Sequence, residues 1–379
     1  MVKRVNGNWH GTQTFFDVFL TGCGFGRGLP CFSVTMKLRK ACTWLALALL
    51  SLMLSTYMVL LYFLDLPKLT GNSHGWHRNI SILLWHWPFN RPYPLEGDVC
   101  LDMYSIPRCL LTDNRSRFDQ ADVVVFHHYE LEMAHQKLPL HLRRPPAQKW
   151  VWLSLESPAM KNISAYNHLF NWTMTYRQDA DIFMPYGRMI PQRTNESFLI
   201  PKHRSCLASW VVSNYNSHHN RSRVVLQLRK HIRVEVYGSS YRRPLAREQL
   251  LPTIARCHFY LAFENAISKD YITEKLWRNA FQAGAVPVVL GPPRSNYEAF
   301  VPRDSFIHVN DFNSTEELAS FLKRLATDKA QYELYFKWHK EHAIHVYSDW
   351  RERLCHICKR YNELPSFKVY HDLQGWAWQ

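Results

Sequence analysis

Short apolar runs alternate with polar, proline-bearing or helix-compatible segments along most of this chain. Runs of this length predict buried strands, and the segments between them predict crossover helices of a parallel α/β sheet. The expected strands of a first series cover Ile80–Trp85, Ala121–His127, Lys149–Leu155 and Asp181–Met184, and those of a second series cover Leu207–Val212, Val234–Tyr237, Phe259–Phe263, Val286–Leu290 and Phe306–Val309.

Each series has the length of one domain, about 120 residues for the first and about 150 for the second. We therefore expect two Rossmann-like domains that face a cleft, over residues 79–200 and residues 201–355. Residues 356–379 are left as a C-terminal segment.

A different pattern precedes them, because residues 41–64 contain no charged residue. A helix of this length would measure about 36 Å, enough to span a bilayer. Residues 1–40 hold six Lys or Arg and one acidic residue, so the positive-inside rule places them in the cytoplasm. This predicts a type II protein with a transmembrane signal-anchor over residues 41–64, a stem over residues 65–78 and a lumenal remainder. A cleaved signal peptide is the alternative, and a start at Met1 or at Met36 stays open.

A lumenal compartment changes how sequons, charge and cysteines are interpreted. Of the sequons beyond the apolar run, Asn114 and Asn162 are the expected glycosylation sites, whereas Asn171 and Asn220 lie close to expected secondary structure. The net charge of the chain is +15, which suits anionic ligands. Nucleic acid is disfavoured as a partner by the compartment and by the dispersed basic residues.

The clearest candidate for chemistry is a strand, loop, helix and strand that run from Phe259 to Gly291. The first strand ends in Glu264 and Asn265, and a helix begins near Thr273 with Glu274 and Lys275. Ligands of parallel sheets bind at this edge, where a helix N-terminus and a lysine would suit a diphosphate. An ordinary βαβ unit with a surface ion pair is the alternative interpretation.

Two further strands deliver polar residues to the same kind of edge. One ends at Ser213 and Asn214 with Arg221 shortly after it, and the strand that begins at Lys149 leads to Glu156 and is stopped by Pro158. A carboxylate at a cleft edge can act as a general base. Taken alone, Glu156 could equally cap a helix or lie in a solvated loop.

These stretches resemble the α-1,3-fucosyltransferase family from Ile80 to the C-terminus, and within it the type that acts on sialylated acceptors. Besides the strand-helix-strand motif, the resemblance is carried by Trp85–Phe89, Asp122–His128, Asp181–Arg188, Gly291–Arg294 and Asp349–Arg353. It implies a GT-B glycosyltransferase in the Golgi membrane, with GDP-fucose bound by the second domain and a lactosamine acceptor by the first.

The resemblance also implies roles for single residues. Glu156 matches the catalytic base of an inverting transfer, and Arg221 with Lys275 would hold the diphosphate without a metal ion or another cofactor. The remaining residues expected to bind the donor are Ser213, Asn214, Tyr260, Glu264, Asn265 and Glu274. Asp179 and Asp181 form an Asp-x-Asp motif, for which a structural role such as pairing with Arg177 is favoured over metal binding.

For the cysteines, an oxidising lumen favours disulfides over metal sites. The family resemblance pairs Cys100 with Cys109 and Cys355 with Cys358. Cys206 and Cys257 could pair with each other or remain two buried thiols, and the sequence leaves this open.

The expected reaction is transfer of fucose in α1,3 linkage to α2,3-sialylated N-acetyllactosamine, which yields sialyl Lewis x structures. Arg188 or Arg193 could meet the sialic acid. One alternative is a sister α-1,3/4-fucosyltransferase with neutral acceptors, and another is a catalytically silent glycan-binding membrane protein. Acceptor choice, sequon occupancy and oligomeric state are not decided by the sequence.

Overall fold

The computed structural model describes residues 43–59, 78–132, 136–158, 162–192, 200–201 and 203–378. The chain divides into two units, Met1–Trp76 and His77–Gln379. In the first unit the described residues 43–59 form a helix. None of the helices in the described residues is both long enough and apolar enough to span a membrane. The ends of the predicted span at residues 41–64 lie outside the described residues, as do the predicted tail and all but the last residue of the stem.

The second unit contains two parallel sheets with one core cluster on each face. The first sheet has the strand order β2-β1-β3-β4-β5-β6, and all its neighbours are parallel. Its strands are β1 (Ile80–Leu84), β2 (Cys109–Thr112), β3 (Val123–His127), β4 (Lys149–Ser154), β5 (Trp172–Thr175) and β6 (Ile182–Phe183). The helices α2 (Val99–Tyr104) and α3 (His128–Glu132) lie in the same part of the chain.

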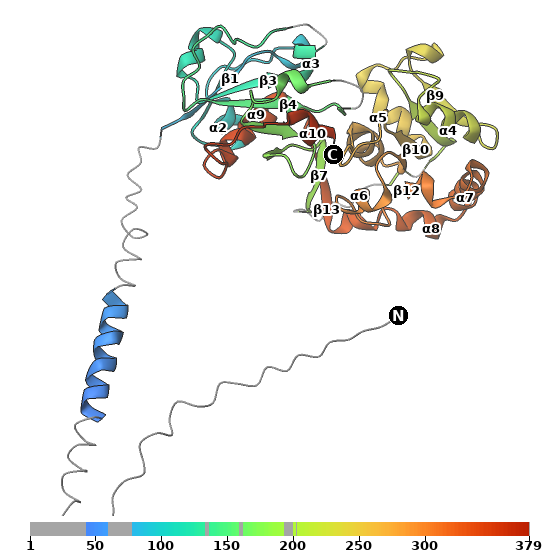
Figure 1. The fold of residues 1–379 in the computed structure, drawn as a ribbon. Coiled ribbons are helices and arrows are strands. Elements are labelled where there is room, and N and C mark those ends of the chain that lie inside the picture. Colours follow the sequence, from blue (N-terminus) through green and yellow to red (C-terminus); the bar gives the residue numbers. More distant parts are fainter. Residues whose placement is uncertain are drawn as a thin grey trace, which may run out of the picture. The chain divides into compact units, whose positions relative to one another are not determined.

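The second sheet has the order β12-β11-β10-β8-β9 and is also parallel throughout. Its strands are β8 (Cys206–Val211), β9 (Val234–Tyr237), β10 (Cys257–Phe263), β11 (Val286–Leu290) and β12 (Ile307–His308). The helices are α4 (Asn220–Leu228), α5 (Arg247–Ala255), the π-helix η5 (Lys275–Gln282), α6 (Arg294–Glu298), α7 (Thr315–Thr327) and α8 (Lys329–Leu334). Figure 1 shows the two groups of elements. The two parallel α/β sheets agree with the predicted fold class.

An antiparallel ribbon of β7 (Gly187–Pro191) and β13 (His342–Val346) connects the two halves of the chain. Its apolar residues Met189, Ile344 and Val346 pack on the core cluster that contains η5. Gly187 is required here, because a Cβ at this position would lie 2.7 Å from the ring of Trp277.

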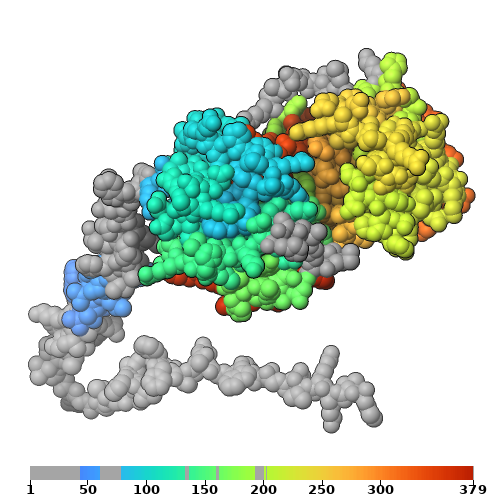
Figure 2. Space-filling model, turned by 90° about the horizontal axis from the view of Figure 1, so that it is seen from above, coloured from blue at the N-terminus to red at the C-terminus, as the bar shows by residue number. Residues whose placement is uncertain are grey.

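The C-terminal residues belong to the first sheet. Helix α9 (Trp350–Arg360) places Leu354 and Ile357 in the core beneath β1, β3 and β4, and Leu373 of α10 (Leu373–Trp378) is buried on the opposite face. In Figure 2 the red C-terminal residues emerge among the cyan and green residues of this half. The expected boundary between residues 355 and 356 therefore falls inside α9, and what was expected as a separate segment completes the first domain.

The disulfide pairing implied by the family resemblance is wrong. Cys100 is bonded to Cys355 and Cys109 to Cys358, in place of Cys100–Cys109 and Cys355–Cys358. The reason is geometric, because Cys355 and Cys358 lie one turn apart on α9 and therefore share a face. That face packs on α2, which carries Cys100, and on β2, which begins at Cys109.

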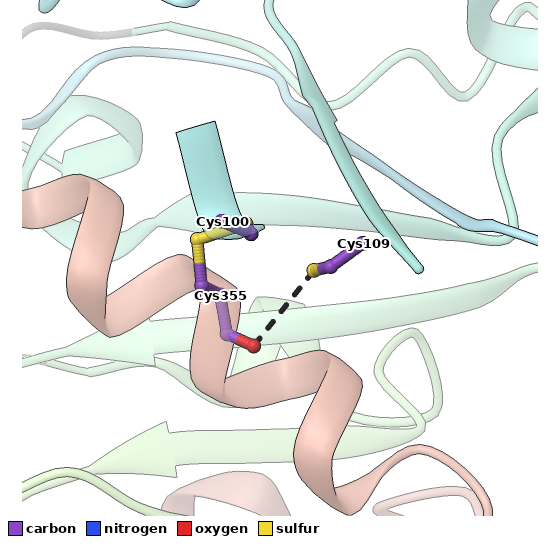
Figure 3. Close-up of side chains that lie close together, drawn as sticks. All are labelled: Cys100, Cys109 and Cys355. Atoms are coloured by element: carbon purple, nitrogen blue, oxygen red, sulfur yellow. Dashed lines mark hydrogen bonds between the residues drawn. A yellow bond between two sulfur atoms is a disulfide. The ribbon is translucent and has the colours of Figure 1, made fainter. Parts of the chain in front are cut away.

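The sulfur atoms of Cys100, Cys109 and Cys355 lie within 4.8 Å of one another, as close as the ligands of a metal site. Figure 3 shows Cys100 bonded to Cys355, with Cys109 Sγ 3.8 Å from the Cys355 carbonyl oxygen. Because all three sulfurs are used in disulfides, no thiolate remains for a metal. Cys206 and Cys257, the pair that the sequence left open, are bonded across the neighbouring strands β8 and β10.

Candidate active site

Glu156 lies two residues beyond the end of β4 and is exposed at the edge of the first sheet. Its carboxylate accepts a hydrogen bond from the Tyr271 hydroxyl at 3.2 Å. The Tyr186 hydroxyl donates to the carbonyl oxygen of Leu155 at 2.5 Å. The side chain and the backbone of this loop are therefore each held by a tyrosine, and Tyr271 comes from the loop that follows β10 in the second domain. The hydrogen bond from Tyr271 restrains one oxygen of this exposed carboxylate.

The carboxyl end of β10 forms a charged cluster around Lys275. Glu264 is 5% exposed and accepts hydrogen bonds from the backbone and the hydroxyl of Thr273. Lys275 Nζ lies 3.1 Å from Glu264 and 3.3 Å from Glu274, and donates to the Thr273 hydroxyl at 2.8 Å. Gly291 leaves room for Glu264, because a Cβ there would lie 3.1 Å from Glu264 Cγ. Glu264 thus orients the lysine ammonium.

Electrostatics keep this lysine charged. Although burial by itself lowers the pKa of Lys275, the carboxylates of Glu264 and Glu274 raise it above its usual range. Burial raises the pKa of Glu264, whereas Lys275 draws the pKa of Glu274 below its ordinary value against the effect of burial. The cluster therefore presents a permanent cation with an adjacent carboxylate.

Arg221 lies in the first turn of α4 and is 5% exposed. Its Nη2 donates to the Asn214 carbonyl oxygen at 2.5 Å, and its Nε has no hydrogen-bond partner in the part of the chain that the structure describes. Burial lowers the pKa of this guanidinium, and the carboxylates of Glu264 and Glu274 oppose that effect. The cation that the sequence assigned to a phosphate therefore lies near the Lys275 cluster with an N–H group unused. A buried donor of this kind is costly unless a ligand accepts from it.

The other predicted donor-binding residues divide into two groups. Ser213, Asn214 and Asn265 are exposed and follow directly on β8 and β10. Tyr260 is fully buried, and its hydroxyl accepts a hydrogen bond from Asn279 Nδ2 at 3.1 Å. Burial raises the pKa of Tyr260 to about 12. This tyrosine therefore supports the cluster from the core and does not line the surface.

The loop between β10 and η5 is fastened to the first domain by further hydrogen bonds. The hydroxyls of Ser268 and Ser157 lie 2.6 Å apart, and Asp270 accepts from the Gln178 backbone at 2.9 Å. Asp270 is buried with a left-handed φ of 61°, a conformation that is held only by surrounding contacts. Together with Tyr271, these contacts bring the predicted donor motif of the second domain to the candidate base of the first.

The Asp-x-Asp motif is used for structure. Arg177 binds Asp179 through two hydrogen bonds of 2.8 and 2.6 Å, which confirms the predicted pair. Hydrogen bonding to Arg177 holds the pKa of Asp179 below its usual value. Asp181 accepts from Lys368 at 2.6 Å and from the Tyr370 hydroxyl at 2.8 Å. Both carboxylates thus anchor neighbouring segments of the chain.

The residues predicted for sialic acid and glycans are only partly placed. Arg188 is exposed on β7 with its guanidinium 5.8 Å from the centre of the Tyr347 ring, whereas Arg193 lies outside the described residues. Asn114 and Asn162 are exposed, as glycosylation requires. Asn171 is buried and its Nδ2 donates to the Lys368 carbonyl oxygen at 2.8 Å, so it is not accessible to a glycosylating enzyme.

Sequence reasoning missed Tyr271 and Tyr186 as functional residues. Both lie inside the stretches that carried the resemblance, Tyr271 directly before the helix with Lys275 and Tyr186 before Gly187. Burial raises the pKa of both hydroxyls well above their usual value, so they remain hydrogen-bond donors. The available signal was that Tyr186 stands next to Gly187 and Tyr271 next to Asp270. A single sequence does not show that their hydroxyls reach Leu155 and Glu156.

The fold and the site agree with two family descriptions. "Fucosyltransferase, N-terminal" matches residues 77–187, and "Glycosyltransferase family 10 (fucosyltransferase) C-term" matches residues 201–376. The chain belongs to glycosyltransferase family 10, the fucosyltransferases.

Curated relatives of this fucosyltransferase agree with that assignment. It is 47% identical over 324 residues to "Alpha-(1,3)-fucosyltransferase 7" of Mus musculus, which covers 85% of this chain and 82% of the relative. It is 50% identical over 299 residues to the protein of the same name from Homo sapiens, which covers 78% of this chain and 86% of the relative.

A solved structure supports the fold independently. "Crystal Structure of alpha1,3-Fucosyltransferase with GDP-fucose" aligns with a TM-score of 0.51 at 19% identity and covers 78% of this chain and 93% of that chain. At this identity the likeness concerns the fold, which is GT-B-like with two parallel sheets. The family and its named members make this chain a glycosyltransferase enzyme.

Proposed function

We propose that this fucosyltransferase moves L-fucose from GDP-β-L-fucose in α1,3 linkage to the GlcNAc of α2,3-sialylated N-acetyllactosamine, with inversion at the anomeric carbon. The product is a sialyl Lewis x structure on glycoproteins and glycolipids. The observation that carries the proposal is the hydrogen bond between Tyr271, in the donor motif, and Glu156 at the end of β4. It joins a candidate base to a candidate phosphate cluster.

In the proposed reaction, Glu156 accepts the proton of the GlcNAc 3-hydroxyl as that oxygen bonds to the anomeric carbon of fucose. The bond from this carbon to the β-phosphate oxygen breaks on the opposite face, so a β-linked donor gives an α-linked product. Tyr271 keeps one carboxylate oxygen occupied and leaves the other for the incoming hydroxyl. Protonated Glu156 then returns its proton to solvent.

The leaving diphosphate needs a positive environment. Arg221 offers its unused Nε–H, and Lys275 offers an ammonium held by Glu264. Charged hydrogen bonds to phosphate oxygens stabilise the charge that develops on GDP, the work that a metal ion performs in other transferases. We therefore propose a reaction without a metal ion or another cofactor.

The sialylated acceptor is favoured by the resemblance to the fucosyltransferase type that acts on sialylated acceptors, in line with the 47–50% identity to relatives named "Alpha-(1,3)-fucosyltransferase 7". It is also favoured by the net charge of +15 of the chain, of which only +5 lies in residues 1–40. The neutral alternative has an observation of its own. The chain is 42% identical over 316 residues to "4-galactosyl-N-acetylglucosaminide 3-alpha-L-fucosyltransferase 9" of Mus musculus. The higher identity favours the sialylated acceptor.

We further propose that residues 41–64 anchor the protein in the Golgi membrane as a single-pass type II protein. Support comes from the absence of charge over these residues and from the excess of basic residues before them. In this topology the second unit and the exposed sequons at Asn114 and Asn162 lie in the lumen.

An acceptor panel tests the proposal. The full-length chain in a membrane fraction is supplied with GDP-fucose and with α2,3-sialylated or neutral N-acetyllactosamine on the same aglycone. We expect higher kcat/KM for the sialylated acceptor, and unchanged activity in EDTA. Preference for the neutral acceptor would contradict the proposal of a sialylated acceptor. Activity that is lost in EDTA and restored by Mn²⁺ would contradict the proposal that Arg221 and Lys275 replace a metal ion.

A further inference from the structure

A large cavity lies beside the base and takes no part in the reaction as derived so far. Its volume is about 740 Å³, inside the range of about 300–1,000 Å³ found for binding sites of small molecules. Pro158, Tyr176, Arg177 and Ala377 line it and also line the small cavity that contains Glu156. The two cavities therefore share part of their walls, which places the large cavity next to the candidate base.

The lining is of the kind that binds sugars. Trp378 provides aromatic surface and is 53% exposed, whereas Tyr176 is 3% exposed. Gln178 and Asn296 line it with amides that also bind Asp270, and Ser295 adds a hydroxyl. An aromatic face packs on the C–H side of a sugar ring, while amides and hydroxyls hydrogen-bond to its hydroxyl groups.

The charged side chains at this cavity differ from those at the second large cavity. Arg177 and Lys269 both contact the carboxylate of Asp179, so two cations share one anion. Arg177 is buried, whereas the side chain of Lys269 is 51% exposed, which makes Lys269 the accessible cation. The carboxylate of Asp270 is buried and accepts from the neutral groups of Gln178 and Asn296.

The second cavity, of about 480 Å³, lies at the ends of β1 and β3. Its cation Arg115 is outnumbered by the carboxylates of Asp113 and Glu130, and it lies over the Trp85 ring at 4.8 Å. An anionic sugar would be repelled there and attracted by Lys269.

We infer that the large cavity holds the sialylated arm of the acceptor, with the Lys269 ammonium on the sialic acid carboxylate and Trp378 against a sugar face. This inference rests on the proposed function and adds the residues that recognise the acidic sugar. The position of Lys269 explains how an acidic acceptor can be preferred although Arg188 lines neither large cavity.

The test compares full-length wild type with Lys269→Ala and Lys269→Arg on sialylated and neutral N-acetyllactosamine at saturating GDP-fucose. Because Lys269→Ala removes one charge-assisted hydrogen bond from a half-exposed side chain, we expect the kcat/KM ratio of sialylated to neutral acceptor to fall about tenfold. Lys269→Arg should keep most of the ratio. Lys329→Ala is the matched control, because Lys329 is 86% exposed on α8 and lines neither cavity.

A second variant separates recognition from folding. Trp378→Ala should raise KM for the sialylated acceptor several-fold while KM for GDP-fucose stays that of wild type. An unchanged ratio in Lys269→Ala, with normal GDP-fucose KM, would overturn the subsite and leave the proposed function intact. A wild-type chain that fucosylates neither acceptor would overturn the proposed function, and the subsite with it.

Discussion

The two domains of the second unit are completed in opposite ways. The second domain is continuous, and its disulfide joins residues 51 positions apart. The first domain begins at β1 but gains part of its core from α9 and α10, and its two disulfides join residues 255 and 249 positions apart. The candidate base thus lies in the domain that depends on distant parts of the chain, and the phosphate cluster lies in the domain built from neighbouring ones.

Because of this difference, the two domains depend on each other to different degrees. The cluster of Arg221, Glu264 and Lys275 is assembled within the second domain. Glu156 needs Tyr271 from that domain to fix its carboxylate. Donor binding is therefore expected to survive changes in the first domain, whereas transfer requires both.

The largest expected effect comes from Glu156→Gln. The amide keeps the shape of the side chain but cannot take the proton, so kcat should fall by about 10²–10⁴-fold. Binding of GDP-fucose, measured by calorimetry, should remain that of wild type because the donor cluster is untouched. Glu316→Gln, an exposed acid in α7, is the control. Turnover near that of wild type would remove Glu156 from its role.

Removal of the two long-range disulfides is the next largest change. Replacement of Cys100, Cys109, Cys355 and Cys358 by Ser should destabilise the first domain by about 2–5 kcal/mol, as the unfolded chain is no longer closed. Loss of the Cys100–Cys355 bond alone should cost less, because Cys109–Cys358 closes nearly the same loop. Thermal unfolding measures both.

Peptide mapping distinguishes the observed disulfide pairing from the one implied by the family resemblance. Mapping without reduction should recover a peptide in which Cys100 is linked to Cys355. A recovered Cys100–Cys109 peptide would contradict the disulfides described above. Cys206→Ser with Cys257→Ser serves as the comparison for the second domain.

A smaller effect is expected from the donor-side cations. Arg221→Ala and Lys275→Ala should each weaken the binding of GDP by about 1.5–3 kcal/mol and also slow the transfer of fucose. The reason is that both side chains are proposed to donate hydrogen bonds to phosphate oxygens. Exposed Arg223 on the same helix provides the control Arg223→Ala. If GDP bound equally well to Arg221→Ala, the proposal that Arg221 Nε–H donates to a phosphate oxygen would be wrong.

The smallest effect concerns acid pH. Burial lowers the pKa of His86 and His356 in the first domain to about 4, and that of His339 outside it to about 4. The unfolded value is about 6.5, so between pH about 6.5 and about 4 the unfolded chain binds more protons. Stability should therefore be complete above this window and fall as the pH decreases.

Each histidine should contribute on the order of 1 kcal/mol by pH 5 after solvent screening. Hydrogen exchange at pH 7 and pH 5 should show faster opening around His86 and His356, because two of the three histidines lie there. His356→Gln should reduce the slope. A rise in stability on acidification would show that these side chains are not buried neutral.

The sequence predicted the strands well where they are continuously apolar. Val234–Tyr237 and Val286–Leu290 match β9 and β11 residue for residue. Two of the strands that were missed are less apolar or less buried. In β5 the buried Thr173 and Thr175 are polar, and Thr173 is satisfied by Asp181; in β13 every residue is only partly buried.

The site was predictable to the extent that it is local. Lys275, Glu264 and Thr273 lie within 12 positions of one another, and the structure brings all three into contact. The partners of Glu156 and the cysteines lie in segments that are distant in sequence, and a single sequence records no distances between them. Tyr260 was expected to bind the donor, but its side chain lies in the core cluster that contains η5.

The return of the chain end to the first sheet also bears on biosynthesis. Chain synthesis proceeds from the N-terminus, so Cys100 and Cys109 are made well before α9, and their partners follow only about 250 positions later. During this interval the two thiols are near neighbours, and a transient Cys100–Cys109 bond is the easiest one to form. Where that bond forms, thiol–disulfide exchange is needed to reach the final pairs. We therefore expect the last residues to govern the yield of folded protein more strongly than their distance from the candidate base would suggest.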